Sequence, residues 1–370
     1  MEIIQRKKCI LSDSDNIEHV FTFEKFPIRI TSTDSLDQST DQFEDMVWGS
    51  SSLGQIQLIN LLDPDIIYSN YHSTGVIGKI WTEHHKKFFN FINLEPNSKI
   101  LEIGGGSGKL AEHFCETDKN FEYEIIEPSN KSTISDSRFK FTQGFFENYK
   151  FDKKFNIIAH SHCIEHTYDP IKFLNKINDL LNYGDYQYIS IPNMKYGLEN
   201  NSANTLSFEH TFYIDDNVLE YLLNKTDFKI EHKIIEEHSI FVKAVKEKIK
   251  KPVKPDFSYI KELFVKYVDN LHNEVSEISN KIKDKKFYLF GAHMFSLVLL
   301  NLGLESNLLE CILDNDKQKQ NKRMYGTKFL IKSPECLVNL ESPIVVLRGG
   351  VYTEEIKQTI LKINSTTVFV

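Results

Sequence analysis

Cysteine is scarce in this sequence, which has five among 370 residues and no Cys-x-x-Cys pair. The five are odd in number and far apart, at Cys9, Cys115, Cys163, Cys311 and Cys336. This distribution excludes a disulfide framework and a zinc knuckle, because both need paired or clustered cysteines. We therefore expect a protein of a reducing compartment, the cytoplasm.

The sequence also lacks an excess of positive charge and a long uninterrupted apolar run. Its formal net charge is −8, whereas proteins that bind nucleic acid usually present a basic face to the phosphates. The N-terminus has no apolar segment of the kind that a signal peptide needs. Gly291, His293 and Asn301 interrupt the most membrane-like stretch, residues 287–304. We expect neither a nucleic acid nor a membrane as a partner.

The sequence does contain a clear alternation of strand and helix patterns. The β-rich runs are residues 99–103, 123–127, 139–143, 155–160, 186–191, 228–235 and 240–245. Helical patterns separate them, which predicts an α/β fold with a doubly wound, mainly parallel, seven-stranded sheet. Apolar and aromatic residues at helical spacing in residues 75–92 predict an amphipathic helix that leads into this sheet.

The length favours two or three domains. Residues 1–74 have weak periodicity and predict a small irregular N-terminal lobe. Residues 75–246 hold the alternating pattern, and a basic segment with two prolines then reads as a linker. Residues 257–370 begin with the apolar stripe of a long helix and continue as a second α/β domain.

A glycine loop joins the first strand of the alternating region to a helix beginning near Lys109. Gly104, Gly105, Gly106 and Gly108 would let the backbone turn tightly and approach a ligand. A phosphate-binding P-loop is excluded, because Ile103 and Leu110 stand where it needs Gly and Ser or Thr. A dinucleotide loop needs a small residue at Lys109, so NAD is disfavoured but remains an alternative.

An acidic residue ends the next strand at the spacing that a nucleoside-binding site requires. Glu127 lies about twenty residues beyond the loop, where a carboxylate can accept hydrogen bonds from both ribose hydroxyls. The strand at residues 155–160 ends at the same edge of the sheet, where ligands of open α/β sheets bind. The glycine loop, Glu127 and the position of both at the carboxyl edge of the sheet together indicate a nucleoside cofactor.

These motifs resemble a class I methyltransferase domain over residues 75–245. The resemblance implies S-adenosylmethionine as cofactor and S-adenosylhomocysteine as product. It assigns the amino-acid end of the cofactor to Gly104 and Gly106, with Glu102 beside them, and the ribose to Glu127. Residues 144–146, with Phe145 at their centre, would flank the adenine, and His160 would lie at the same crevice.

The layout of the whole chain resembles three-domain methyltransferases that carbon-methylate nucleotide-linked keto-sugars. That family has a small zinc-binding lobe, a central methyltransferase domain and a C-terminal Rossmann-like domain. The resemblance rests on the stretches QIQLINLLDPDIIYSNYHST, SFEHTFYID and FGAHMFSLVLLNLGL. It implies that His166 and the Glu209–His210 pair line the sugar site, with one histidine as general base. Tyr71 and Ser207 would contact the nucleotide-sugar substrate.

Two departures from that family change the expectation. Only Cys9 remains where the lobe should bind zinc, and a structural zinc site needs four ligands. We expect no metal, because successive strand residues point to opposite faces and His160, His162 and His166 need not converge. A metal held by these three histidines remains an alternative. Ser207 replaces a tyrosine of the carbon-methylating members. Carbon methylation needs groups that stabilise an oxyanion, whereas a hydroxyl needs one well-placed base, so the sequence favours O-methylation.

Four alternatives for the function remain open at this point. The acceptor could be a keto-sugar carbon or a small non-sugar metabolite. The glycine loop could instead serve an NAD-dependent sugar oxidoreductase or epimerase, or the chain could be a non-catalytic scaffold. The oligomeric state is not predicted.

Overall fold

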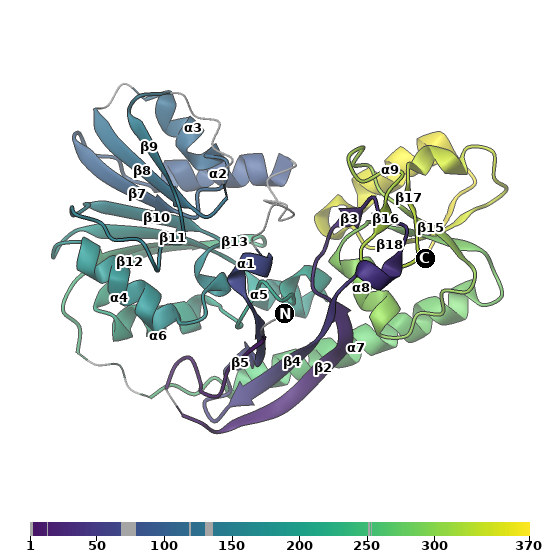
Figure 1. The fold of residues 1–370 in the computed structure, drawn as a ribbon, viewed down its shortest axis with the longest axis horizontal. Coiled ribbons are helices and arrows are strands. Elements are labelled where there is room, and N and C mark those ends of the chain that lie inside the picture. Colours follow the sequence, from purple (N-terminus) through teal and green to yellow (C-terminus); the bar gives the residue numbers. More distant parts are fainter. Residues whose placement is uncertain are drawn as a thin grey trace.

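The computed structural model describes residues 3–12, 14–67, 79–117, 120–129, 136–250, 252 and 254–370. A large sheet lies at one end of the molecule and a smaller one at the other (Figure 1). N-terminal strands and one long helix run between them (Figure 1).

The large sheet has seven strands in the order β12-β13-β11-β10-β7-β8-β9. Its strands are β7 (Ser98–Ile103), β8 (Phe121–Glu127), β9 (Phe139–Gln143), β10 (Ile157–Ser161), β11 (Tyr186–Pro192), β12 (Phe228–Ile235) and β13 (Ser239–Lys246). Five of them, β7 to β11, form parallel pairs, while β13 runs antiparallel to both β11 and β12. The predicted mainly parallel sheet is therefore confirmed, with every predicted strand in it.

Helices cover both faces of this sheet, because its inner strands are apolar on both sides. The helices are α2 (Lys79–Phe91), α3 (Lys109–Cys115), α4 (Pro170–Leu180), α5 (Met194–Glu199) and α6 (Asp216–Lys225). Ile100 packs with Phe88 of α2 and Phe114 of α3, whereas its neighbour Leu101 belongs to the core that contains Phe173 of α4. Alternate strand residues thus serve opposite helix layers.

The strand order reverses beside β7. The chain passes from β7 to β8 and β9 on one side, and then to β10 and β11 on the other. Open α/β sheets bind ligands at such a reversal, in the crevice outside the carboxyl ends of the strands. This edge carries the glycine loop after β7 and the short 3-10 helix η2 (Ile164–His166) after β10.

The N-terminal residues are more regular than predicted. They form β1 (Ile3–Gln5), β2 (Ile17–Pro27), β3 (Ser32–Thr33), η1 (Gln38–Thr40), β4 (Phe43–Ser51), β5 (Ile56–Leu58), β6 (Asn60–Leu62) and α1 (Pro64–Ile67). The long strands β2 and β4 pair antiparallel, but their register shifts twice. Each shift moves the following side chains to the opposite face. The two-residue periodicity is therefore broken, and the expectation of an irregular lobe was wrong.

The C-terminal third begins with the predicted long helix, α7 (Ser258–Ile282). The smaller sheet has the order β17-β15-β14-β18-β19, and all its pairs are parallel. Its elements are β14 (Phe287–Phe290), α8 (Met294–Asn301), β15 (Leu309–Leu313), β17 (Ile331–Lys332), η4 (Pro334–Leu337), β18 (Ile344–Leu347), η5 (Gly350–Tyr352), α9 (Thr353–Ile363) and β19 (Val368–Phe369). A separate strand, β16 (Arg323–Met324), pairs with β3 and so joins the two ends of the chain. Among the described residues, no helix has both the length and the apolar character needed to cross a membrane.

Candidate active site

In the glycine loop after β7, Gly105 packs against the sheet and Gly106 faces away from it. A Cβ added at Gly105 would lie 2.8 Å from both Glu102 Cδ and Ile125 Cγ2, so only glycine fits there. Gly106 has φ +54°, and a Cβ added there would meet no described residue within 4 Å. The loop therefore packs on β7 and β8 through Gly105 and borders open space at Gly106.

Two carboxyl groups support this loop from different positions. Glu102 is buried beneath it and accepts a hydrogen bond from Tyr123 Oη at 2.8 Å. Burial raises the pKa of Glu102 to about 7. Glu127 accepts from the backbone N–H groups of Gly106 at 3.0 Å and Ser129 at 2.9 Å. A carboxylate has about four acceptor positions, so Glu127 can still accept further hydrogen bonds at the crevice.

Of the other two residues predicted to bind the cofactor, Phe145 lies near Glu127, because Gly144 N–H donates to the carbonyl oxygen of Glu127 at 2.9 Å, whereas His160 faces the core. Phe145 is half-buried and follows Gly144, where an added Cβ would also lie more than 4 Å from every residue that the structure describes. His160 is completely buried within β10, with its ring 5.4 Å from that of Phe173 on α4. Burial lowers the pKa of His160 to about 4. The structure thus places His160 in the core beneath α4 instead of at the glycine loop.

The structure brings together the two histidines proposed as bases. His166 ends η2 and His210 follows η3 (Ala203–Thr205), and their ring centroids are 5.2 Å apart. His166 Nδ1 contacts the carbonyl oxygen of Glu209 at 2.8 Å, and His210 Nδ1 contacts that of Thr205 at 2.9 Å. A carbonyl oxygen only accepts, so Nδ1 carries the proton in each neutral ring and Nε2 carries the lone pair. Burial lowers the pKa of His210, which favours the neutral ring.

A third group of this site was missed in the sequence. Glu165 is completely buried, and neither carboxylate oxygen has a hydrogen-bond partner among the described residues. Its Oε1 lies 3.7 Å from His162 Nδ1 and 3.7 Å from His166 Nε2. Burial raises the pKa of Glu165 to about 8. We call Glu165, His166 and His210 the EHH cluster. Its only signal in the sequence was the position of Glu165 immediately before His166.

Backbone contacts hold the two halves of the EHH cluster together. Thr211 N–H donates to the carbonyl oxygen of Glu165 at 2.9 Å, and Thr211 Oγ1 donates to that of Thr167 at 2.6 Å. Ser207 Oγ accepts from the N–H groups of Glu209 and His210, both at 3.2 Å. The structure therefore gives Ser207 a role in orienting the half-buried Glu209 and His210, whereas the sequence suggested substrate contact.

An arginine of the N-terminal segment, Arg6, donates hydrogen bonds to the backbone around the EHH cluster. Arg6 is 9% exposed and donates to the carbonyl oxygens of Leu58, Tyr168 and Thr211. These three acceptors come from β5, from the segment after η2 and from the segment after His210. The N-terminal strands therefore help to position the EHH cluster.

The glycine loop and the EHH cluster are neighbours. A Cβ added at Gly104 would lie 3.4 Å from Cys163 Sγ, and Cys163 is the N-cap of η2, which carries Glu165 and His166. A ligand at the loop and a second ligand at the cluster would therefore meet across this contact. The arrangement suits transfer of a group from one to the other.

A second histidine cluster gathers around one hydroxyl. Ser239 Oγ lies 3.1 Å from His84 Nδ1, 2.9 Å from His162 Nε2 and 2.6 Å from His238 Nδ1. A hydroxyl donates one hydrogen bond and accepts two, so these three contacts satisfy it. Burial, reinforced by His85 and His238, lowers the pKa of His84 to about 2. In the sequence His84 belonged to the apolar stripe of α2, and this cluster was not foreseen.

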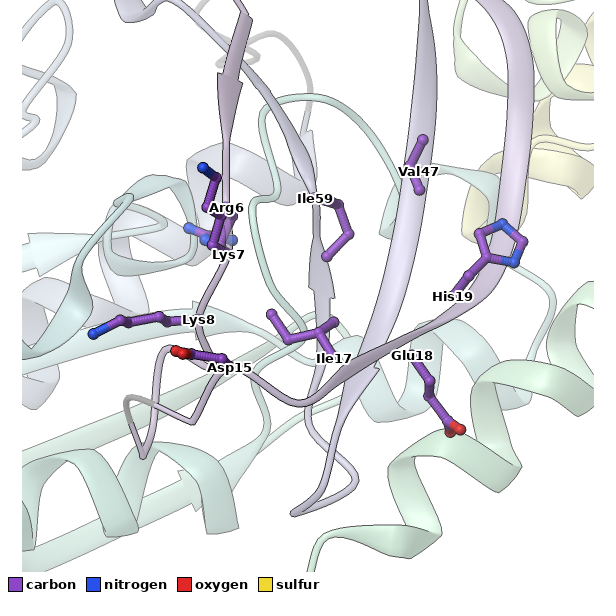
Figure 2. A pocket seen from close by; sticks show the side chains of 9 residues that line it. All are labelled: Arg6, Lys7, Lys8, Asp15, Ile17, Glu18, His19, Val47 and Ile59. Carbon is purple, nitrogen blue, oxygen red and sulfur yellow. The ribbon is translucent and has the colours of Figure 1, made fainter.

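Tyr71, predicted to contact the substrate, falls outside the residues that the structure describes. A surface groove of about 580 Å³ is lined by nine residues of the N-terminal region, drawn in Figure 2. In that view Lys8 and His19 lie at opposite ends of the groove (Figure 2). Its charged groups do not converge on one point, so the groove does not resemble a second site.

Comparison with known proteins identifies the region around the glycine loop as similar to a methyltransferase domain. A family model described as a methyltransferase domain matches residues 80–233. A search of curated proteins found no match.

Three similar solved structures each cover less than half of the chain. A putative S-adenosylmethionine-dependent methyltransferase from Listeria monocytogenes is 13% identical, covering 46% of this chain and 100% of that one, with a TM-score of 0.40. A putative methyltransferase from Bacillus halodurans is 14% identical over 45% and 99% of the chains, with a TM-score of 0.36. A 1,6-didemethyltoxoflavin N1-methyltransferase from Burkholderia thailandensis is 13% identical over 46% and 81%, with a TM-score of 0.36. Similarities at this level support no inference of their own.

The matched residues 80–233 contain the glycine loop, Glu127 and the EHH cluster. Residues 80–233 form a methyltransferase domain, and the chain is an S-adenosylmethionine-dependent methyltransferase. The open space at Gly106 and Gly144, with Glu127 at its edge, fits this cofactor. Gly104, Gly106 and Glu127 are the residues that would hold it.

Two alanine substitutions test this placement with matched strain. Gly106 and Gly303 have φ of +54° and +97°, and at both an added Cβ would meet nothing within 4 Å in the described part of the chain. Each replacement should therefore cost about 1–2 kcal/mol of stability. Only Gly106→Ala puts a methyl group into the space assigned to the cofactor, so only it should weaken S-adenosylhomocysteine binding, by about tenfold or more. Titration calorimetry measures the affinities, and equal affinities would contradict the placement.

Proposed function

We propose that this methyltransferase acts on a hydroxyl group of a nucleotide-activated sugar. The observation that carries the proposal is the EHH cluster beside the glycine loop. O-methylation needs a hydroxyl that loses its proton as it attacks, and two imidazoles with a carboxylate suit that step. Ser207 Oγ already accepts two backbone N–H groups. It is therefore poorly suited to replace the tyrosine that carbon-methylating relatives carry.

The choice of a nucleotide sugar rests on the layout of the chain. The proposal takes residues 1–74 as a lobe, 75–246 as the methyltransferase domain and 257–370 as a second, Rossmann-like domain that binds the nucleotide part. Arg6 supports this division, because it links the lobe to the segments around the EHH cluster. The sugar would lie between the lobe and the methyltransferase domain.

S-adenosylmethionine, when bound, supplies an electrophilic methyl group on a sulfonium sulfur. The chain's own residues align the acceptor and take up its proton. Alignment alone can lower the barrier by about 7–11 kcal/mol in ideal cases. Glu127 and the loop glycines would fix one reactant, and the EHH cluster would fix the other. The hydroxyl proton would leave through this cluster to solvent.

A panel of nucleotide sugars tests the proposal by mass spectrometry. Each is incubated with enzyme and S-adenosylmethionine, and one should gain the mass of a CH₂ group. The panel includes hydroxyl and keto forms with deuterium on the ring carbons. O-methylation keeps every deuterium, whereas methylation at a ring carbon releases one. Loss of a deuterium would support the keto-sugar alternative. Methyl transfer to a non-sugar metabolite alone would overturn the substrate class.

A further inference from the structure

We propose that Glu165, His166 and His210 bind one divalent first-row transition-metal ion at the acceptor side of the glycine loop. Each residue offers a ligand atom, and the three atoms lie within 4.8 Å of one another. The binding proposal does not depend on the substrate. Only the part that the ion plays in catalysis rests on the proposed function.

The histidines are held as metal ligands usually are. The Nδ1–H of His166 donates to the carbonyl oxygen of Glu209, and that of His210 donates to the carbonyl oxygen of Thr205. Such outer hydrogen bonds fix the tautomer and the ring orientation of metal-bound histidines. The other ring nitrogen of each histidine, Nε2, carries the lone pair that an ion would bind, and His166 Nε2 lies 3.7 Å from Glu165 Oε1.

The carboxylate supplies the independent evidence for a missing ligand. Glu165 is completely buried, and both of its oxygens lack a hydrogen-bond partner among the described residues. Burying a carboxyl group without partners costs free energy, and buried charges are normally paired or bound to metals. A cation between Glu165 and the two Nε2 atoms would offset this cost.

The second histidine cluster, unlike the EHH cluster, has hydrogen-bond partners for its facing nitrogens. The facing nitrogens of His84, His162 and His238 also lie within 4.8 Å of one another. Their common centre, however, is occupied by Ser239 Oγ, which bonds to all three. That cluster is internally satisfied, and it provides the control for the EHH cluster.

Two imidazoles and one carboxylate favour a transition metal over magnesium or calcium, which prefer oxygen ligands. Three protein ligands also leave coordination positions open. A sugar hydroxyl bound at one of them would lose its proton more easily, because a bound cation lowers the pKa of an oxygen ligand. His166 and His210 would then act as metal ligands, where the sequence suggested a general base.

Cobalt binding to the full-length protein tests the site without any substrate. The protein is treated with a chelator, dialysed and titrated with Co²⁺, with visible absorption reporting nitrogen and oxygen coordination. Wild-type protein and His238→Asn should each bind one equivalent, which excess Zn²⁺ displaces. Glu165→Gln and His210→Ala should bind at least about tenfold more weakly. Circular dichroism of the ion-free proteins checks that each variant is folded.

The outcomes separate the ion site from the proposed function. Equal Co²⁺ affinity in wild-type and Glu165→Gln protein, or no binding at all, would overturn the ion site. Loss of binding in His238→Asn alone would assign the ion to the other cluster and would also overturn it. Co²⁺ binding without methylation of any nucleotide sugar would overturn the substrate and keep the ion site. Full methylation of a nucleotide sugar by the ion-free enzyme would keep the substrate and overturn the part that the ion plays in catalysis.

Discussion

Replacing His210 by alanine should lower the rate of methyl transfer by about 10²–10⁴-fold, the usual contribution of a positioned proton-transfer group. The affinity for S-adenosylhomocysteine should hardly change, because His210 follows η3 and makes its hydrogen bond to Thr205, not to the glycine loop. The loss is expected whether His210 accepts the proton or holds an ion. Steady-state kinetics and titration calorimetry on the same preparation measure the two quantities.

His272→Ala is the matched control, because His272 is an exposed histidine on α7. Its turnover should equal that of the unmodified enzyme. Wild-type turnover in both His210→Ala and His166→Ala would remove the EHH cluster from the mechanism. A parallel fall in cofactor affinity would instead indicate that His210 supports the loop.

Arg323→Met should destabilise the protein by about 3–5 kcal/mol, because it leaves a buried carboxylate without its partner. The Arg323 and Asp41 side chains are 2% and 1% exposed, with Nη2 and Oδ1 2.9 Å apart. The guanidinium also donates to the carbonyl oxygens of Ser35 and Asp37. Arg323 thus fastens the N-terminal segment to the C-terminal region. Urea denaturation followed by circular dichroism measures the loss.

An exposed ion pair provides the comparison for this substitution. Lys229 and Glu247 are 59% and 54% exposed and 3.5 Å apart, and pairs of this kind contribute about 0–1 kcal/mol. Lys229→Met should therefore leave the urea midpoint nearly unchanged. Similar small losses in both variants would show that Arg323 is not a structural anchor.

The central sheet could be predicted because its signal is local. Strands such as β7 and β10 are short apolar runs between helical patterns, and the glycine loop marks the turn after β7. The N-terminal strands could not be predicted in the same way. The register shifts in β2 break its two-residue alternation, and the pairing of β3 with β16 joins residues about 290 positions apart.

The candidate site was predictable where residue type and spacing define it. Gly106 and Glu127 lie together as their spacing indicated, and their hydrogen bond of 3.0 Å joins the loop to β8. Glu165 was missed because what distinguishes it is its complete burial, and the burial of a single glutamate cannot be inferred from its sequence neighbours. The contact of His84 with Ser239 depends on tertiary packing of α2 against β13.

Ligand binding by titration calorimetry tests the central claim of a methyltransferase most directly. The account predicts that S-adenosylhomocysteine binds in a one-to-one complex, that NAD⁺ shows no measurable binding, and that Gly106→Ala weakens the first interaction. Tight binding of NAD⁺ without binding of S-adenosylhomocysteine would contradict it.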